Sequence, residues 1–237
     1  MDRLYGRNSV REALRAGRRR FHRLLLAAEI GDILELARRE RLTVEAVDRH
    51  RLEALVDGHH QGVVAEAEPF AYATLSDLFS LEQPLILVLD SLQDPQNFGT
   101  LLRTAQAVGV DAVLIPEHRA VGVTPAVSNA SAGAVEHLRV ARVTNLARSL
   151  EQLKSRGVWT YGLTVDAEQP FWTADLRGPL ALVVGSEGTG LGRLVRETCD
   201  LLLRIPMASD SVQSLNASVA GSLVLYEAFR QRPSRNP

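Results

Sequence analysis

The sequence contains one cysteine, Cys199, among 237 residues. A single thiol cannot close an internal disulfide and has no second cysteine with which to hold a metal, so we expect neither kind of cross-link. No apolar run approaches the roughly 18 residues that are needed to cross a bilayer, and the segment from Met1 to Arg23 carries charges where a signal peptide would be apolar. These absences predict a cytoplasmic protein with no membrane segment and no metal site.

The chain also lacks an overall positive charge, since its 27 basic residues face 28 acidic ones and the net charge is −1. Taken over its whole length, it is not the strongly basic protein that nucleic-acid binders often are. The segment from Arg3 to Arg23 differs, because it holds eight arginines and one acid, Glu12.

Arg7, Arg11 and Arg15 recur every four residues and would line one side of a helix that Asn8 caps. Such a stripe suits RNA phosphates, and a solvated helix face is the alternative interpretation. The residues that we expect to contact RNA are Arg7, Arg11, Arg15, Arg18 and Arg19.

The hydrophobic fraction of 46% and charged fraction of 23% are those of a globular protein and exclude disordered and low-complexity classes. Residues 1–67 alternate short helical and strand patterns, which predicts a small α/β domain. Residues 68–75 lose this periodicity and contain Pro69, so we expect a linker there. Residues 76–232 form the second domain, and residues 233–237 are a tail.

The second domain alternates apolar runs of strand length with amphipathic stretches. Uninterrupted Leu, Ile and Val runs are typical of strands that are buried on both faces, so we predict a mostly parallel sheet between helices. The expected strands are Leu85–Leu89, Ala112–Ile115, Leu138–Ala141, Trp159–Leu163, Leu180–Val184 and Leu201–Ile205. The expected helices are Gly99–Val108, Pro125–Ala134, Leu146–Arg156, Leu191–Thr198 and Leu215–Arg230.

Ligands of open α/β sheets bind at the carboxyl ends of the strands, where a glycine-rich loop follows Val184. This loop has no lysine at the position that a phosphate-binding P-loop requires, which excludes that class of ATPase. Arg193 stands where a dinucleotide fingerprint needs its third glycine, so the pattern also disfavours a nicotinamide cofactor.

Polar residues in three such loops form a candidate site. Asn97 lies near a helix start and Arg103 lies within the same, otherwise apolar, helix. Alone, Arg103 could be a structural ion pair, Glu187 a turn residue, and Ser214 or Asn216 a helix cap. Together they offer a cation, an anion and neutral hydrogen-bonding groups beside a glycine-rich backbone, as a polar small-molecule site requires.

These segments resemble the three motifs of the SpoU/TrmH group of RNA 2′-O-ribose methyltransferases, within the SPOUT superfamily. The motifs are Asn97-x-Gly99-x-x-x-Arg103, Val184-Gly185-Ser-Glu187-Gly188 and Ile205-Pro206-Met207 leading to Ser214-Leu215-Asn216. Tyr5-Gly6-x-Asn8 and His60-Gln61-Gly62 are similar to the substrate-binding domain of bacterial 23S rRNA (guanosine-2′-O-)-methyltransferases, whose fold is that of certain ribosomal proteins. The loop from Ala208 to Gln213 departs from the family pattern.

The resemblance implies a trefoil-knotted catalytic domain that follows a small RNA-binding domain. It implies a homodimer with its active site at the subunit interface, and large-subunit rRNA as the substrate. A tRNA ribose methyltransferase and a non-catalytic RNA-binding protein of the same fold are the alternatives. The cofactor implied is S-adenosyl-L-methionine, held by Gly185, Ile205, Met207, Ser214, Leu215 and Asn216.

The same resemblance assigns catalysis to Arg103, Asn97, Glu187, Ser214 and Asn216. A ribose 2′-hydroxyl is a weak nucleophile, so its attack on a methyl group needs exact placement and removal of its proton. We expect Arg103 to hold the adjacent phosphate and stabilise the developing alkoxide, while the other four side chains maintain the site. Whether Arg103 or that phosphate takes the proton is left open.

Overall fold

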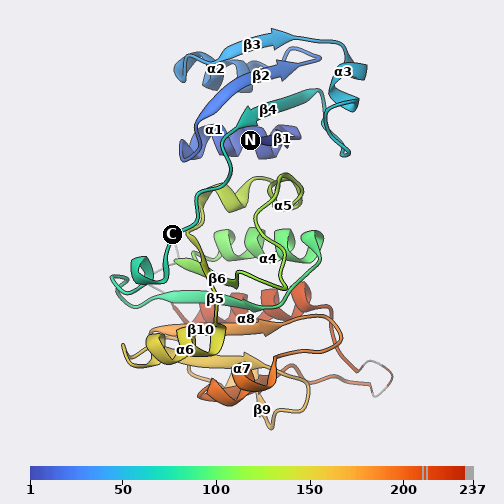
Figure 1. Ribbon diagram of the computed structural model, residues 1–237. Coiled ribbons are helices and arrows are strands. Elements are labelled where there is room, and N and C mark those ends of the chain that lie inside the picture. The colour runs from blue at the N-terminus through green and yellow to red at the C-terminus, as the bar shows by residue number, and fades with distance from the viewer. Residues whose placement is uncertain (210, 212, 233–237) are drawn as a thin grey trace. The chain divides into compact units, whose positions relative to one another are not determined.

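The computed structural model describes residues 1–209, 211 and 213–232. Its contacts divide the chain into two compact units (Figure 1). Unit 1 comprises Met1–Ala71 together with Val123–His137, and unit 2 comprises Tyr72–Gly122 together with Leu138–Pro237.

Unit 1 contains a four-stranded sheet in the order β1-β4-β2-β3. Strands β2 and β3 are parallel, and β4 is antiparallel to both β1 and β2. Its first elements along the chain are β1 (Asp2–Tyr5), α1 (Arg7–Ala16), β2 (Phe21–Leu26), α2 (Gly31–Arg39), β3 (Thr43–Ala46), α3 (Arg49–Glu53) and β4 (Val63–Ala67).

Helices cover both faces of this sheet. On one face α1 and α2 bury Val10, Leu14 and Ile33 against Leu24 of β2. On the other face Leu52 of α3 packs against the sheet. Strand β1 and helix α3, neither of which the sequence patterns predict, complete the three layers.

The predicted start of α1 is wrong by two residues. The helix begins at Arg7, and Gly6 is the N-cap with φ 85° and no side-chain capping bond. Asn8 is therefore inside the helix, where it accepts a hydrogen bond from the Arg11 guanidinium. A glycine suits the cap because its positive φ is costly for residues that carry a Cβ.

The segment that follows β6 in the sequence belongs to unit 1. It contains α5 (Pro125–Ala130) and η2 (Ala134–His137). The Asn129 side-chain amide donates to the carbonyl oxygen of Tyr5 at 3.0 Å, and His137 pairs with Glu12 at 3.1 Å. These contacts explain why unit 1 is built from two separate segments of the chain. The domain boundary that the sequence places at residues 68–75 stays a prediction.

Unit 2 contains a seven-stranded sheet in the order β7-β6-β5-β10-β8-β11-β9, and every neighbouring pair is parallel. The strands are β5 (Leu85–Asp90), β6 (Ala112–Pro116), β7 (Val140–Val143), β8 (Trp159–Leu163), β9 (Gln169–Pro170), β10 (Leu180–Gly185) and β11 (Leu201–Arg204). The helices are η1 (Leu75–Leu78), α4 (Pro95–Ala107), α6 (Leu146–Lys154), η3 (Phe171–Thr173), α7 (Arg193–Thr198) and α8 (Ala217–Gln231).

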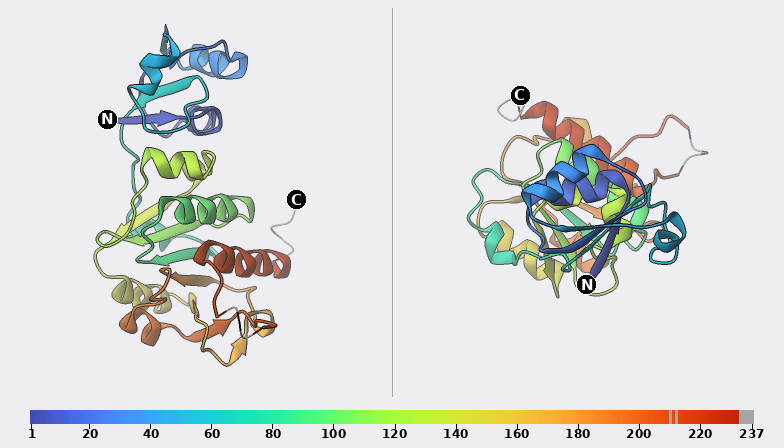
Figure 2. Two further views of the ribbon diagram at one scale, coloured as in Figure 1. Left: turned by 90° about the vertical axis from the view of Figure 1, so that its right-hand side faces the viewer. Right: turned by 90° about the horizontal axis from the view of Figure 1, so that it is seen from above.

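The central strands are buried throughout, which is why their sequences show continuous apolar runs. Helices α6 and α7 contribute Leu150 and Val195 to the core on one face. Helices α4 and α8 lie side by side (Figure 2), and their Thr104 and Ser222 hydroxyls are 2.9 Å apart.

The predicted architecture is confirmed: an α/β chain with a small mixed domain and a mostly parallel sheet between helices. All six expected strands of the second domain are present, and only the two-residue edge strand β9 was not expected. The knot that the resemblance implies stays a prediction. The tail at 233–237, and Asp210 and Val212 of the atypical loop, lie outside the described residues.

Among the described residues, no helix has both the length and the apolar character that a membrane span requires. The part of the chain that the structure describes also holds no group of three His, Cys, Asp or Glu side chains arranged to bind a metal ion.

Candidate functional site

The glycine-rich loop after β10 folds back on itself. The N–H of Gly190 donates to the carbonyl oxygen of Ser186 at 3.0 Å, and the N–H of Ser186 donates to that of Gly190 at 3.2 Å. A Cβ at Gly185 would lie 2.2 Å from the carbonyl carbon of Gly190, far inside van der Waals contact. Only glycine therefore fits at Gly185 without moving the loop.

The carboxylate of Asp90 holds the far end of this loop. Asp90 is the last residue of β5, is 6% exposed, and accepts the N–H of Gly192 at 2.7 Å. Its other oxygen accepts the Ser91 hydroxyl at 3.0 Å. Asp90 is missing from the predicted site, although an acid that directly follows a continuous apolar run is a recognisable signal.

A cavity of about 480 Å³ opens at the carboxyl ends of β8, β10 and β11. This volume is within the range of small-molecule and cofactor sites. Six predicted site residues line it: Gly185, Glu187, Ile205, Met207, Ser214 and Leu215. Backbone from the glycine-rich loop and apolar side chains from the end of β11 thus face one space, as the sequence predicts.

Asp166 and Arg196 also line the cavity and form an ion pair at 2.9 Å. Hydrogen bonds from the Thr164 hydroxyl and the Arg196 guanidinium lower the pKa of Asp166. The pair places fixed charges of both signs at the cavity. Sequence reasoning missed it because Asp166 and Arg196 lie 30 positions apart in otherwise unremarkable segments.

Asn97, Glu187 and Asn216 are joined by hydrogen bonds beside the cavity. The Asn97 side chain donates to Glu187 and accepts from the Asn216 amide at 2.9 Å. Asp94 caps α4, and the Asn216 side chain caps α8 by accepting the N–H of Ser218 at 2.9 Å. The three loops that carry the motifs are therefore linked through their side chains.

Arg103 does not belong to this hydrogen-bonded group. It is exposed on α4 and does not line the cavity, and its side chain has no hydrogen-bond or ion-pair partner among the described residues. The structure therefore does not show the ion pair that was the alternative interpretation of Arg103. Its guanidinium is available to a ligand or to another chain.

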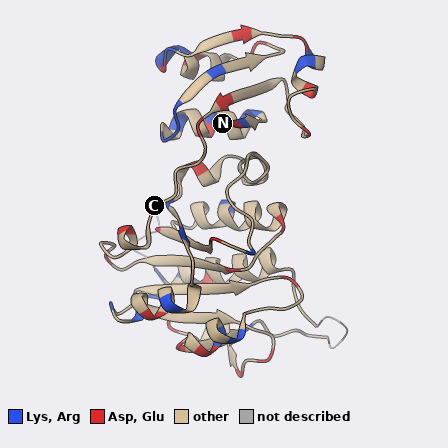
Figure 3. Ribbon diagram, in the orientation of Figure 1, with Lys and Arg blue, Asp and Glu red and all other residues tan. Residues whose placement is uncertain are grey.

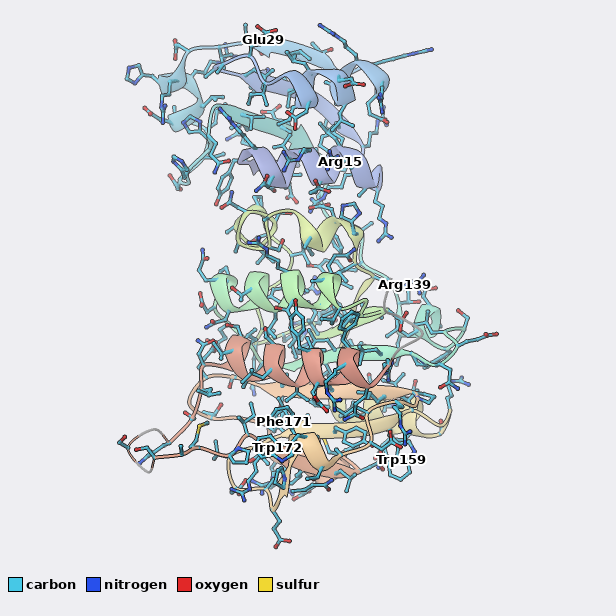
Figure 4. All side chains as sticks on the ribbon, turned by 180° about the vertical axis from the view of Figure 1, so that it is seen from behind. Arg15, Glu29, Arg139, Trp159, Phe171 and Trp172 are labelled. Carbon is cyan, nitrogen blue, oxygen red and sulfur yellow. The ribbon has the colours of Figure 1, made fainter. Side chains whose placement is uncertain are left out.

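The predicted RNA-binding arginines of unit 1 have different surroundings. Arg7 is exposed and donates to the carbonyl oxygen of Gln61 at 3.2 Å. Arg11 pairs with Asp32 at 3.1 Å, and Arg15, labelled in Figure 4, pairs with Glu12 at 2.9 Å. Arg18 is exposed.

Arg19 is the exception, because its side chain is 2% exposed. Its guanidinium donates to both oxygens of Glu136 at 2.8 and 2.9 Å and to Asp2 at 2.7 Å. A guanidinium that is buried and paired in this way cannot reach a phosphate, so we correct the prediction and remove Arg19 from the RNA-binding set. The charge pattern could not reveal this, because the partner Glu136 lies 117 positions away.

The remaining motif residues of unit 1 are structural. His60 is buried, and its Nδ1 accepts the N–H of Gly62 at 3.0 Å. Burial lowers the pKa of His60, which favours the neutral ring that can accept this bond. Gln61 accepts the N–H of Arg7 at 2.8 Å, so this turn fixes the start of α1.

Cys199 is partly buried against the core of unit 2, and its thiol is a poor nucleophile. Burial, with a smaller contribution from Asp200, raises the pKa of its thiol to about 12. The thiol is therefore protonated near neutral pH, which is the form that reacts poorly as a nucleophile.

Comparison with known proteins places both parts of the chain in one group. The profile of the SpoU rRNA Methylase family matches residues 84–226, and that of RNA 2′-O ribose methyltransferase substrate binding matches residues 3–73. YacO of Bacillus subtilis, named as a TrmH family tRNA/rRNA methyltransferase, is 47% identical over 98% of this chain and 96% of its own.

The 23S rRNA (guanosine-2′-O-)-methyltransferase RlmB of Pseudomonas syringae is 41% identical over 99% of this chain and 98% of its own. The crystal structure of the SpoU methyltransferase AviRb from Streptomyces viridochromogenes in complex with AdoMet is 27% identical. It superposes with a TM-score of 0.85 over 98% of this chain and 90% of AviRb. The chain belongs to the SpoU rRNA methylase family.

Proposed function

We propose that this protein transfers a methyl group from S-adenosyl-L-methionine to the ribose 2′-hydroxyl of a guanosine in 23S ribosomal RNA. The coarser statement follows from family membership: the chain is an S-adenosylmethionine-dependent RNA methyltransferase. The finer proposal is supported by the whole-chain match to a relative that is named for that reaction. The match of residues 3–73 to a substrate-binding domain of RNA 2′-O ribose methyltransferases agrees with it.

The cavity fits the cofactor. Its volume of about 480 Å³ suits a molecule of that size, and the close approach of Gly185 to Gly190 leaves backbone groups facing the space. We propose that Gly185, Ile205, Met207 and Leu215 hold it, mainly through backbone and apolar contacts. When bound, S-adenosylmethionine supplies an electrophilic methyl group on its sulfonium.

The chain's own residues would position the ribose and manage its proton. Asn97, Glu187 and Asn216 keep the three loops in register, and Ser214 lies at the cavity wall. Arg103, which has no partner among the described residues, binds the phosphate next to the target ribose and stabilises negative charge as it develops on the 2′-oxygen.

A second copy of the chain would complete the site. Val219, Leu223 and Tyr226 recur at helical spacing on α8 and are 47%, 44% and 53% exposed, and Trp172, in η3 beside α8, is 52% exposed (Figure 4). Arg103 is exposed on the neighbouring helix α4, as these three side chains are on α8. We propose that a homodimer covers this apolar surface and brings Arg103 to the interface.

Transfer of labelled methyl groups to purified RNAs tests the proposal. We expect label in 23S rRNA and none in 16S rRNA or transfer RNA, and we expect the Arg103→Ala variant to lose the activity. Preferential labelling of transfer RNA would establish the alternative tRNA methyltransferase. Cofactor and RNA binding without transfer to any RNA would favour the non-catalytic alternative.

A further inference from the structure

The helical stripe of arginines in unit 1 is largely neutralised by neighbouring acids. Arg11 is bound by Asp32, Arg15 by Glu12, and Arg19 by the buried Glu136. A phosphate would have to displace a carboxylate from each of these guanidinium groups. Another set of arginines on this unit faces no such competition.

These arginines lie where α1 and α2 end. Helices α1 and α2 pack side by side on one face of the sheet (Figure 2), and each connects two parallel strands, so both run opposite to the strands. Their C-terminal ends therefore meet at one end of the unit. Arg20 immediately precedes β2, Arg38 lies in the last turn of α2, and Arg41 lies between α2 and β3.

This end of the unit carries more exposed positive charge than negative. Arg20, Arg38 and Arg41 are exposed, and none of their side chains has a hydrogen-bond or ion-pair partner among the described residues. Arg39 pairs with Glu35, and the exposed Glu40 lies between Arg39 and Arg41. Blue segments gather at this end of the unit in Figure 3.

The backbone at Arg41 gives a second indication. Arg41 has φ 53°, in the left-handed region, and closes α2 through its N–H to the carbonyl oxygen of Arg38 at 3.1 Å. The N–H of Leu42 bonds to Ala37 at 2.9 Å, which completes a helix-ending turn that normally uses glycine. An arginine here is conformationally unfavourable, and its side chain makes no compensating hydrogen bond or ion pair within the described chain.

We propose that Arg20, Arg38 and Arg41 form a surface that contacts the phosphate backbone of the RNA substrate. This inference rests on the proposed function and identifies where unit 1 holds that substrate. An unpaired guanidinium can present its fork of N–H donors to a phosphate without first breaking an ion pair. The surface binds RNA of any sequence, because phosphates carry no base identity.

Binding of the full-length protein to a 30-nucleotide RNA hairpin, measured at several salt concentrations, tests the surface. The Arg20→Ala/Arg38→Ala/Arg41→Ala variant should bind at least about tenfold more weakly, and its salt slope should fall by roughly 2 to 3. The control variant, Arg49→Ala/Arg51→Ala/Arg177→Ala, loses the same charge from arginines that pair with acids of the chain. It should keep the wild-type affinity and slope to within about one unit.

The single variant Arg41→Gly separates binding from folding. Glycine relieves the unfavourable φ, so its unfolding temperature should equal or exceed that of the wild type while its RNA affinity falls several-fold. Wild-type affinity in Arg41→Gly and in the triple variant would overturn the proposed surface. If the triple variant unfolds, Arg41→Gly alone decides.

Methyl transfer in the same preparations keeps the two proposals apart. At saturating RNA, Arg41→Gly and the Arg20→Ala/Arg38→Ala/Arg41→Ala variant should retain the wild-type turnover number, and both should show a raised KM for RNA. A wild-type protein that transfers no methyl group to RNA would contradict the proposed function. An unchanged KM in Arg41→Gly and in the Arg20→Ala/Arg38→Ala/Arg41→Ala variant would contradict the proposed RNA-binding surface but not the proposed function.

Discussion

Replacing Gly185 by alanine should disable cofactor binding while leaving the fold intact. The added Cβ would lie 2.2 Å from the carbonyl carbon of Gly190, 2.4 Å from its oxygen and 2.5 Å from the nitrogen of Leu191. All three atoms belong to the backbone, so no side chain can rotate away. Restoring ordinary contact, which begins at 3.4 Å, requires the loop to move by about 1 Å.

A displacement of about 1 Å in a binding site can reduce the rate of reaction by about 100-fold. The cost of overpacking is about 1–3 kcal/mol of unfolding free energy, which a chain of this size can tolerate. We therefore expect single-turnover methyl transfer by Gly185→Ala to be at least about 100-fold slower, and calorimetry to show weakened binding of S-adenosylmethionine. Its thermal unfolding should remain cooperative.

Gly188→Ala is the matched control in the same loop. Gly188 has φ +86°, but no atom lies within 4 Å of the position of its Cβ. Alanine there adds backbone strain of about 1–2 kcal/mol without a clash. Cofactor affinity in Gly185→Ala within about twofold of the Gly188→Ala value would refute the assignment of this loop to the cofactor.

Four further predictions follow from individual contacts. Arg103→Ala should lower single-turnover methyl transfer by about 100- to 1,000-fold with little change in cofactor affinity, and lysine should restore little; wild-type rates would remove Arg103 from the mechanism. Glu136→Gln breaks the buried pair with Arg19 and should lower the unfolding free energy by about 3–5 kcal/mol in denaturant titrations, whereas the exposed Glu35→Gln should change it by less than about 1 kcal/mol. Hydrogen bonding to Arg23 lowers the pKa of Glu66 below its ordinary 4.5, so the stability that this pair contributes is present above pH 4.5 and is lost as the pH falls through the folded pKa. Glu66→Gln should therefore reduce the loss of unfolding free energy at acid pH. An unchanged loss would exclude the pair as its source. Cys199, with a pKa of about 12, should resist iodoacetamide at pH 8 in the native protein and react after denaturation, and rapid native alkylation would contradict its burial.

The sequence patterns predict unit 2 better than unit 1 for a physical reason. Strands such as β5 and β10 are buried on both faces, so uninterrupted apolar runs mark them clearly. Strand β3 is mostly exposed, and the four-residue β1 begins almost at the N-terminus, so neither offers a comparable signal. The sequence patterns missed β1 for this reason.

In the candidate site, too, sequence patterns predict some features and miss others. Gly185, Ile205 and Leu215 line one cavity, because motif order and the parallel sheet together place these loops at one edge. Asp166 and Arg196 pair across 30 positions, and Arg19 and Glu136 across 117, so local patterns do not reveal either pair. Charge spacing identifies where arginines lie in the sequence, but only the fold shows which of them are neutralised.

The most direct test of the central claim is the identity of the methylated nucleoside. Large-subunit RNA from cells that lack this enzyme would be incubated with the protein and labelled S-adenosylmethionine, digested to nucleosides and separated by mass. We predict that 2′-O-methylguanosine is the only nucleoside that carries the label. Label on a base, on another ribose or in no nucleoside would contradict the account.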